Sequence, residues 1–442
     1  MTKKKITILF GGLLLGIATF AQDQTTFEEQ TKQRLSILED KSSANKLQLS
    51  GYIQFDTKYT QNSDNILNSE GFIDWDKTKN LDTWVDDIRR ARLKGVYSAP
   101  YGKATLEFNI SPFSIGSSKV SGVSLKNAFI QTYIPSYEFI SLTTGVFERP
   151  FGYELSYSSS TMETAERSIA CQALLPGEQD LGAKLTLTGK SGFLTRFTLD
   201  AGLFTGNGLS SDGPTNVHSN KKHFIGRLAY KQHFDKFSLS GGISYYNGDY
   251  FVKGDLGTGK GTLAFWDNDA KKYLQTINGS DTVFSTKRKY FGADVQAFAH
   301  TEIGSTSFRA ELYTGQQPTT GGWGNWRSNS DGTVNNNGDN KVYNFTGFYV
   351  LLVQDIWTTK HSLVFRYDMF DPNTKVKGDE IKSKDDLNKS VLSIGYLYRA
   401  SVNLRILIDY DIVSNETSKE IKGWKKNDRR DNILTLRLQY KF

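Results

Sequence analysis

The clearest hydrophobic pattern in the chain is a strict two-residue alternation over residues 432–442. One face carries Leu434, Leu436, Leu438, Tyr440 and Phe442, and the other carries Ile433, Thr435, Arg437, Gln439 and Lys441. Because successive side chains of a strand point to opposite faces, this pattern predicts a strand with lipid or protein core on one side and water on the other. The last strand of a soluble sandwich and the closing strand of a membrane barrel both fit this pattern. A terminal Phe also resembles the C-terminal signal of outer-membrane barrels.

The same two-residue period recurs along the chain in segments of roughly nine to eleven residues, the length of a transmembrane strand. It predicts sixteen strands, at 47–59, 89–98, 103–111, 125–134, 138–147, 181–189, 193–203, 223–231, 236–246, 289–299, 305–314, 345–354, 361–368, 389–398, 402–411 and 433–442. Each segment alone is a weak signal, so the spacing between the segments carries more weight.

The connections between the predicted strands alternate between short and long. The short connections are 100–102, 135–137, 190–192, 232–235, 302–304, 356–360 and 399–401. The long connections are 60–88, 112–124, 148–180, 204–222, 247–288, 315–344, 369–388 and 412–432. Bacterial barrels have short periplasmic turns and longer extracellular loops, whereas a sandwich or propeller has no reason to place every long connection on one side. The rhythm therefore predicts an all-β, 16-stranded antiparallel transmembrane β-barrel, wide enough to enclose an aqueous channel.

The start of the chain predicts export. Lys3, Lys4 and Lys5 precede the apolar run 6–20, and small residues near Ala21 suit cleavage there, so 1–21 has the pattern of a signal peptide. We expect residues 22–46 to form a short periplasmic segment, either helical or a disordered lead-in, and 47–442 to form the barrel. No later segment approaches about 20 consecutive apolar residues, so membrane insertion requires a closed barrel. The expected location is the outer membrane of a Gram-negative bacterium.

The composition and charge of the chain agree with a transmembrane β-barrel. The chain has 28 Phe, 22 Tyr, 7 Trp and 40 Gly, with a hydrophobic fraction of only 38%, which suits interfacial aromatic girdles and turns. Its single cysteine, Cys171, excludes an intramolecular disulfide. The formal net charge of +7 falls to +4 without the three lysines of the predicted signal peptide, which gives no argument for a nucleic-acid partner.

Strand parity assigns charged side chains to the lumen. In the second predicted strand Arg90, Arg92 and Lys94 share one face, and three cations facing lipid would be costly, so we expect them to face water. The same parity places further arginines in the lumen: Arg196, Arg227, Arg309, Arg366, Arg405 and Arg437. Acidic residues also lie on polar faces: Asp56, Glu107, Asp200, Asp294, Glu311, Asp368 and Asp409. Cross-strand pairing and a positively charged anion pathway are both open interpretations, with the second favoured for Arg90, Arg92 and Lys94.

Several ordered motifs resemble the phosphate-selective porin O and P family. They are Ile88–Leu93, Gly145–Glu154, Ser158–Ser160 with Glu166-Arg167, Pro176–Gly182, Arg366–Asp368 and the terminal Phe442. The resemblance implies a trimeric sixteen-stranded porin whose third long loop folds inward and narrows the channel. It also implies that Arg89 and Arg90 help to form an anion site. Where the family has a Tyr two positions further on, this chain has Arg92, and no Lys lies between Phe151 and Gly182, unlike the lysine-bearing loops of the selective channels.

The third long connection supplies further candidate residues. Pro150 lacks a backbone donor and Gly152 permits a turn, so the strand before them ends there. Guanidinium and hydroxyl groups can replace the water that an oxyanion loses. The candidate anion-binding or pore-lining residues are Arg89, Arg90, Arg92, Lys94, Arg149, Ser158, Ser159, Ser160 and Arg167.

These patterns predict a passive outer-membrane porin for small anions, phosphate or related oxyanions, with no enzyme activity, cofactor or metal. The expected partners are outer-membrane lipid, two further copies in a homotrimer, and the barrel-assembly machinery through the C-terminal strand. A general or carbohydrate-accepting porin, or a structural barrel in a surface assembly, are the alternatives. Residues 254–260 match only part of a phosphate-binding loop, and 331–340 form either a plain surface loop or a calcium-binding one.

Overall fold

The computed structural model describes residues 46–63, 81–110, 122–134, 137–175, 177–206, 222–253, 261–267, 269, 272–278, 283–319, 339–381, 386–420, 428 and 431–442. Within them, the barrel strands are β1 (Lys46–Ser63), β2 (Leu81–Ala99), β3 (Gly102–Ile110), β4 (Val123–Ile134), β5 (Tyr137–Glu148), β6 (Gln179–Thr188), β7 (Phe197–Phe204), β8 (His223–His233), β9 (Phe237–Lys253), β12 (Val283–Thr301), β13 (Gly304–Thr319), β14 (Asp339–Ile356), β15 (Thr358–Asp371), β16 (Lys389–Arg399), β17 (Leu404–Asn415) and β18 (Ile433–Lys441).

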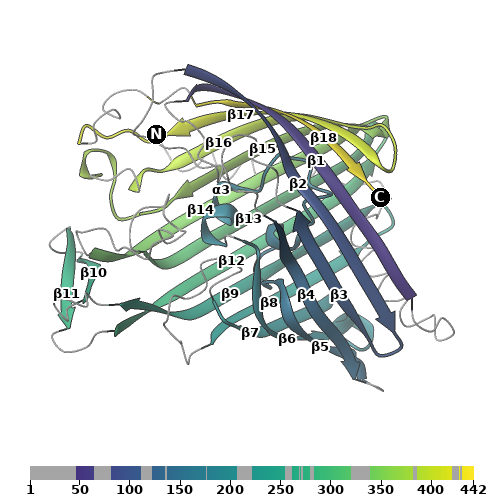
Figure 1. Cartoon of the computed structure of the whole chain (residues 1–442), viewed down its shortest axis with the longest axis horizontal. Coiled ribbons are helices and arrows are strands. Elements are labelled where there is room, and N and C mark those ends of the chain that lie inside the picture. The colour runs from purple at the N-terminus through teal and green to yellow at the C-terminus, as the bar shows by residue number, and fades with distance from the viewer. Residues whose placement is uncertain are drawn as a thin grey trace.

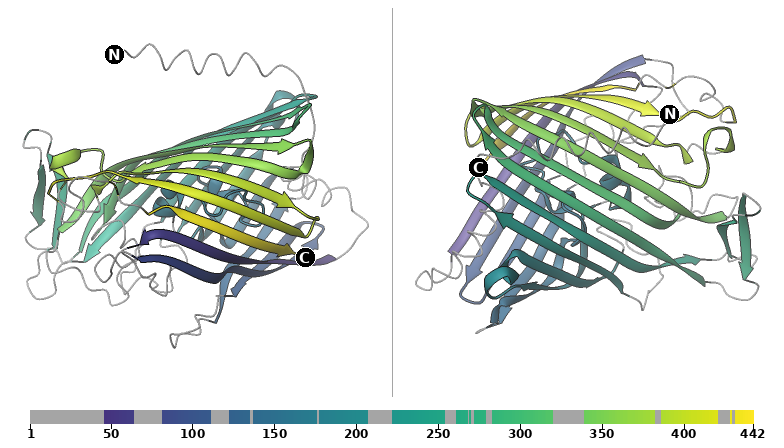
Figure 2. Two further views of the ribbon diagram at one scale, coloured as in Figure 1. Left: turned by 90° about the horizontal axis from the view of Figure 1, so that it is seen from above. Right: turned by 180° about the vertical axis from the view of Figure 1, so that it is seen from behind.

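The barrel is closed and antiparallel. Each of these strands pairs with the next along the chain, and β1 pairs with β18, with Tyr52 opposite Lys441 and Thr60 opposite Ile433. Figure 2 shows this seam, where the last strand lies beside the first. Two further strands, β10 (Gly261–Asp267) and β11 (Lys272–Asn278), form a hairpin between β9 and β12. β10 also pairs in parallel with the start of β14, near the end of the barrel that carries the long connections.

The sixteen predicted strands and their alternating connections are confirmed. The main differences lie at the outer ends, where several strands are longer than predicted; β2, for example, begins at Leu81 rather than at residue 89. Beyond the apolar band both faces of a strand meet water, so the alternation that marks the strand disappears. The β10–β11 hairpin lies in a connection that was expected to be a loop. Strand β7 starts only at Phe197, because the turn before it forms the 3-10 helix η2 (Gly192–Arg196).

Side-chain exposure follows the predicted parity. In β18, Leu436, Leu438 and Tyr440 are exposed on the outer face, whereas Thr435 and Arg437 are 2% exposed inside the barrel. In β2, Leu93 and Tyr97 likewise lie outside. On these strands the outer face is therefore apolar and the inner face polar, as a lipid environment requires.

The connection between β5 and β6, residues 149–178, enters the barrel and is called the inward loop below. It contains the 3-10 helix η1 (Glu154–Ser156) and the helix α3 (Ile169–Leu174). Figure 1 shows α3 within the ring of strands. A further 3-10 helix, η4 (Gly378–Glu380), follows β15. The inward fold of the third long loop, expected from the family resemblance, is therefore present.

Several predictions fall outside the described residues. They concern the signal peptide 1–21, the periplasmic segment up to residue 45, the stretch 254–260 and most of 331–340. Among the described residues, no helix has the length and apolar character needed to cross a membrane.

Candidate functional site

The inward loop begins with a tight turn at residues 149–152. Gly152 has a φ of +67°, and a Cβ there would overlap the Glu311 carboxylate of β13. The same carboxylate accepts hydrogen bonds from the backbone N–H groups of Tyr153 and Glu154 at 2.9–3.2 Å. Glycine is required here both by the backbone conformation and by the close approach of β13. The turn directs the chain into the lumen.

One side of the lumen is lined by an aromatic wall, formed by Tyr246, Tyr290, Tyr313, Phe345 and Tyr349 of β9, β12, β13 and β14. These rings are all nearly inaccessible to solvent.

Phe151 of the inward loop stacks on Tyr313, with ring centroids 6.2 Å apart, and meets Tyr290 edge to face at 6.1 Å. Leu155, Leu174 and Cys171 belong to the same buried cluster. The loop is therefore attached to this wall by apolar contacts, which are non-directional and depend on the area buried.

The opposite side is lined by an arginine wall, formed by Arg89, Arg90 and Arg92 of β2 and Arg437 of β18. A β-bulge explains why two consecutive arginines face the lumen. Gln54 of β1 pairs with Arg90, but the next residue, Phe55, pairs with Ile88, so Arg89 is an extra residue on β2. A bulge of this kind shifts the side-chain parity by one position. Strict alternation, which predicts only Arg90, Arg92 and Lys94 on this face, misses Arg89.

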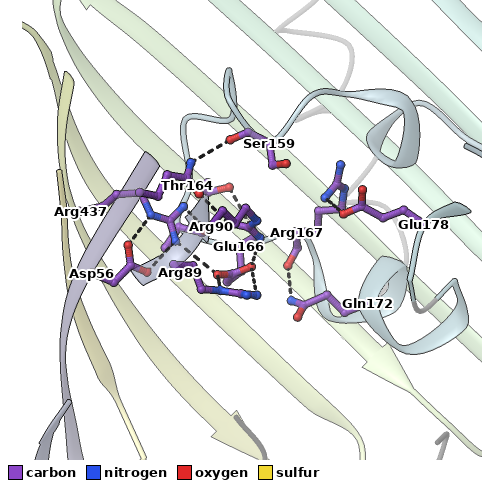
Figure 3. Close-up of polar contacts among 12 residues, drawn as sticks. Asp56, Arg89, Arg90, Ser159, Thr164, Glu166, Arg167, Gln172, Glu178 and Arg437 are labelled. Carbon is purple, nitrogen blue, oxygen red and sulfur yellow. Dashed lines mark hydrogen bonds and ion pairs between the residues drawn. The ribbon is translucent and has the colours of Figure 1, made fainter. Parts of the chain in front are cut away.

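Three guanidinium groups of the arginine wall converge on the carboxylate of Glu166 in the inward loop (Figure 3). Arg89 donates through Nε and Nη2 at 2.6 and 3.0 Å, Arg90 through Nη2 at 2.7 Å, and Arg437 through Nη2 at 3.3 Å. Burial alone would raise the pKa of the Glu166 carboxyl, but the attraction of the three arginines outweighs burial and holds the pKa well below its usual range. Glu166 is therefore an anion at neutral pH.

The rest of the arginine wall is held by other partners. Arg437 forms a bidentate pair with Asp56 of β1, both contacts 2.7 Å, and donates to the Ala165 carbonyl at 2.6 Å. Arg90 donates through Nη1 to the Gln54 side chain at 3.0 Å. The pair between Arg437 and Asp56 crosses the seam where the barrel closes. Arg437 therefore links the last strand both to the first strand and to the inward loop.

The three candidate serines lie on the inward loop and differ in their partners. Ser159 is 2% exposed; its hydroxyl accepts from Arg92 at 2.7 Å and bonds the Tyr52 hydroxyl at 3.0 Å. The Ser160 carbonyl accepts from the Gln439 side chain of β18 at 3.0 Å. Ser158 is exposed and bonds the Ser160 hydroxyl within the loop. Ser159 and Ser160 therefore contribute mainly to docking the loop on the wall.

Arg167 and Arg149 face the interior of the loop. Arg167 pairs with Glu178 at 2.5 Å and donates to the carbonyl oxygens of Glu154 and Tyr157 at 3.2 and 2.7 Å. Arg149 donates to the Glu178 carbonyl at 3.3 Å. Lys126 of β4 holds the other carboxylate oxygen of Glu178 at 2.6 Å. Burial would raise the pKa of Glu178, but Arg167 and Lys126 together lower it below the usual range.

Lys94 is half-buried on the lumen face of β2, and the described part of the chain gives it no ion pair. The other predicted lumen arginines are mostly paired: Arg227 with Asp294, Arg309 with Glu163, and Arg366 with Asp368. Arg405 donates to Gln439 at 3.0 Å. The prediction for Arg196 was wrong, because this residue lies exposed in η2 over the Phe193 ring, where strand parity does not apply.

Sequence reasoning missed Glu166 as a member of the site, together with Gln54 and Gln439, which contact the loop from β1 and β18. In the sequence, Glu166 stands out only as part of the motif Glu166-Arg167. A carboxylate in a loop predicted to face an arginine-rich wall is the signal that could have identified it. Gln54 shares the polar face of Asp56 in β1, but a neutral side chain gives no electrostatic reason to single it out.

No protein-family model matches the chain, and no curated protein matches it in sequence. Solved structures match it over nearly its whole length. The outer membrane channel DcaP of Acinetobacter baumannii is 13% identical with a TM-score of 0.52, and the match covers 91% of this chain and 98% of that one. The anion-selective porin from Comamonas acidovorans is 10% identical with a TM-score of 0.51, covering 90% and 100%.

The Salmonella typhi OmpF structure in complex with daunomycin is 12% identical with a TM-score of 0.51, covering 90% of this chain and 98% of that one. At such identities the likeness shows the fold, which is that of the outer-membrane porins of Gram-negative bacteria. Within this class, membership of the phosphate-selective porin O and P family stays a prediction.

Proposed function

We propose that the protein is a passive porin of the outer membrane that prefers small anions, with phosphate or a related oxyanion as the solute. The convergence of Arg89, Arg90 and Arg437 on one carboxylate carries this proposal. A carboxylate and a phosphate present similar oxygen acceptors to guanidinium groups, so a wall that binds the first suits the second. The motif resemblance described above supports phosphate in particular.

Two further cations extend this positive strip along β2. Arg92 and Lys94 follow Arg90 at alternate positions, and the described residues give neither of them an ion pair. Fixed positive charge lowers the barrier for an anion and raises it for a cation. Arg92 and Lys94 are therefore the residues expected to set the sign of the selectivity.

Reversal potentials of single channels in planar bilayers test this function. Under a KCl gradient we expect the wild-type channel to prefer chloride, and the double variant Arg92→Ala/Lys94→Ala to lose much of that preference. The matched control, Lys190→Ala/Arg196→Ala, removes two cations from a periplasmic turn and should leave selectivity nearly unchanged. Cation preference in the wild-type channel would contradict the proposal.

A structural barrel is the second candidate, and one observation favours it. The inward loop bonds to strands on all sides of the lumen, including β2, β9, β13, β15 and β17. These contacts tie the loop across the lumen, an arrangement that would restrict the passage of solutes. Purified protein that inserts into bilayers but never conducts would support this candidate over a porin.

We further propose a homotrimer, surrounded by outer-membrane lipid and inserted by the barrel-assembly machinery through β18. The exposed apolar face of β18, with Leu436, Leu438 and Tyr440, supports contact with lipid. Sedimentation of the protein in detergent tests the trimer, since a monomeric mass would exclude it.

A further inference from the structure

The Glu166 carboxylate occupies the point on which three guanidinium groups converge. Its two carboxylate oxygens accept from Arg89, Arg90 and Arg437 at 2.6–3.3 Å. We propose that Glu166 is a tethered internal ligand of an exchangeable oxyanion site, and that a small oxyanion such as phosphate binds by displacing this side chain. The role of the exchange in transport rests on the proposed anion channel, whereas the binding site itself does not.

The arginines differ in the hydrogen-bond partners that they retain when the Glu166 side chain is displaced. Arg437 retains its bidentate pair with Asp56. Among the described residues, Arg89 donates only to Glu166, and Arg90 otherwise donates only to the neutral Gln54 side chain. Displacement therefore leaves two neighbouring guanidinium groups without a hydrogen-bonded carboxylate among the described residues. Partly desolvated cations of this kind require an anion, and their planar forks suit one with several oxygens.

The site is accessible from one side. The side chains of Arg89 and Glu166 are 37% and 23% exposed, whereas those of Arg90 and Arg437 are 6% and 2% exposed. A solute in the lumen therefore meets Arg89 first, with the two buried arginines behind it. This arrangement allows an incoming anion to contact Arg89 before Glu166 has left.

The Glu166 side chain can leave without opening the loop. On one side of it, the Ala165 N–H donates to Asp409 at 2.7 Å and the Ala165 carbonyl accepts from Arg437 at 2.6 Å. The Glu166 carbonyl itself accepts from Arg366 at 2.5 Å. The backbone is therefore fixed on both sides of the Glu166 Cα atom, and exchange needs only rotation of side-chain torsions between staggered rotamers.

Tethering sets the concentration at which exchange occurs. A group held close to its partner competes at an effective concentration on the order of millimolar or more. A free oxyanion must reach a comparable level before it displaces Glu166 from the wild-type site. Removing the charge of Glu166 removes the competitor, so the site should then fill at a much lower concentration of the free ion.

The test compares wild-type protein with Glu166→Gln, using inorganic phosphate as the probe. In planar bilayers the chloride current is measured while phosphate is added, and we expect Glu166→Gln to lower the half-blocking phosphate concentration by about tenfold or more. Adding Arg89→Ala to this variant should abolish the gain. The matched control is Asp200→Asn, which also removes one lumen carboxylate, at 3.3 Å from Lys184, and should change the block less than about twofold.

The possible outcomes distinguish failure of the Glu166 exchange from failure of the proposed anion channel. An anion-selective wild-type channel with the same phosphate block in Glu166→Gln would overturn the inference and leave the function standing. An equal gain in Asp200→Asn would also overturn it, because the effect would then reflect lumen charge in general. If the wild-type protein does not conduct, the proposed function fails, and calorimetric titration of the detergent-solubilised protein tests the site alone. Tighter phosphate binding by Glu166→Gln would support it, and equal affinities would refute it.

Discussion

The inward loop is held by two walls of the lumen that use different physics. At the aromatic wall, Phe151 and Leu155 pack among buried rings. At the arginine wall, Ser159 and Glu166 are held by guanidinium groups and hydroxyls. Apolar contacts depend on buried area and offer no donor or acceptor for which a solute could substitute. An ionic contact, in contrast, can be exchanged for a contact with a charged solute. The comparison indicates that the aromatic wall fixes the loop, whereas the arginine wall supplies the exchangeable contacts of the proposed anion site.

The largest expected effect comes from breaking the aromatic side. Phe151 is 1% exposed, and its replacement by Ala should destabilise the docked loop by about 3–5 kcal/mol. The chain's single cysteine reports on this, since Cys171 is buried in α3 and burial raises the pKa of its thiol well above the usual range. We expect maleimide to label wild-type Cys171 hardly at all, and the Phe151→Ala variant roughly 100-fold faster or more.

Phe193→Ala is the matched control, because Phe193 is exposed at a periplasmic turn. Its labelling rate should equal that of the wild-type protein. Rapid labelling of wild-type Cys171 would mean that the aromatic wall does not hold the loop as described.

A smaller effect is expected at the arginine side. Ser159→Ala removes the acceptor of Arg92 and the partner of Tyr52, both at a buried position, and should cost about 1–3 kcal/mol of stability. Ser158→Ala, at an exposed position of the same segment, should cost less than about 0.5 kcal/mol. Thermal unfolding in detergent, followed by tryptophan fluorescence, compares the two. Equal effects would show that docking of Ser159 contributes nothing of its own.

The smallest effect concerns pH. Because the pKa of Glu166 is lowered in the folded protein, its contribution to stability is fully present above the ordinary value of 4.5 and is lost as pH falls through the folded pKa. The difference in unfolding temperature between wild type and Glu166→Gln should therefore be constant from about pH 5 to 8 and shrink in stronger acid. A difference that already shrinks between pH 8 and 5 would contradict a strongly ionised Glu166.

The sequence predicts the walls better than it predicts the loop between them. Alternation in β18 places Arg437 inside and Leu436 outside, and both positions agree with their exposure. Parity also placed Asp56 on the polar face of β1. The register between β1 and β18, which joins Asp56 to Arg437, is fixed only when the barrel closes. The sequence therefore predicts that charged side chains pair across strands, but it does not identify which two residues form each pair.

Two features of the site had no periodic signal. The bulge at Arg89 interrupts alternation by one residue, and a single interruption cannot be told from a strand end. The partners of the inward loop lie far away in sequence; Glu166 and Arg437, for example, are separated by 271 positions. Their contact depends on how a non-repetitive segment folds inside a closed wall. The alternation of residues along a strand identifies its two faces, whereas a loop has no such period.

The last residue meets a glycine at the seam. Gly51 and Phe442 exchange backbone hydrogen bonds of 2.9 and 3.0 Å, and a Cβ on Gly51 would lie 2.5 Å from the Phe442 ring. A shift of β18 by two residues along β1 would place this ring opposite Leu49 or Ile53, which have side chains where Gly51 has none. Gly51 thus leaves room for the Phe442 ring in the observed alignment, and any larger side chain at position 51 would force the ring or the backbone to move.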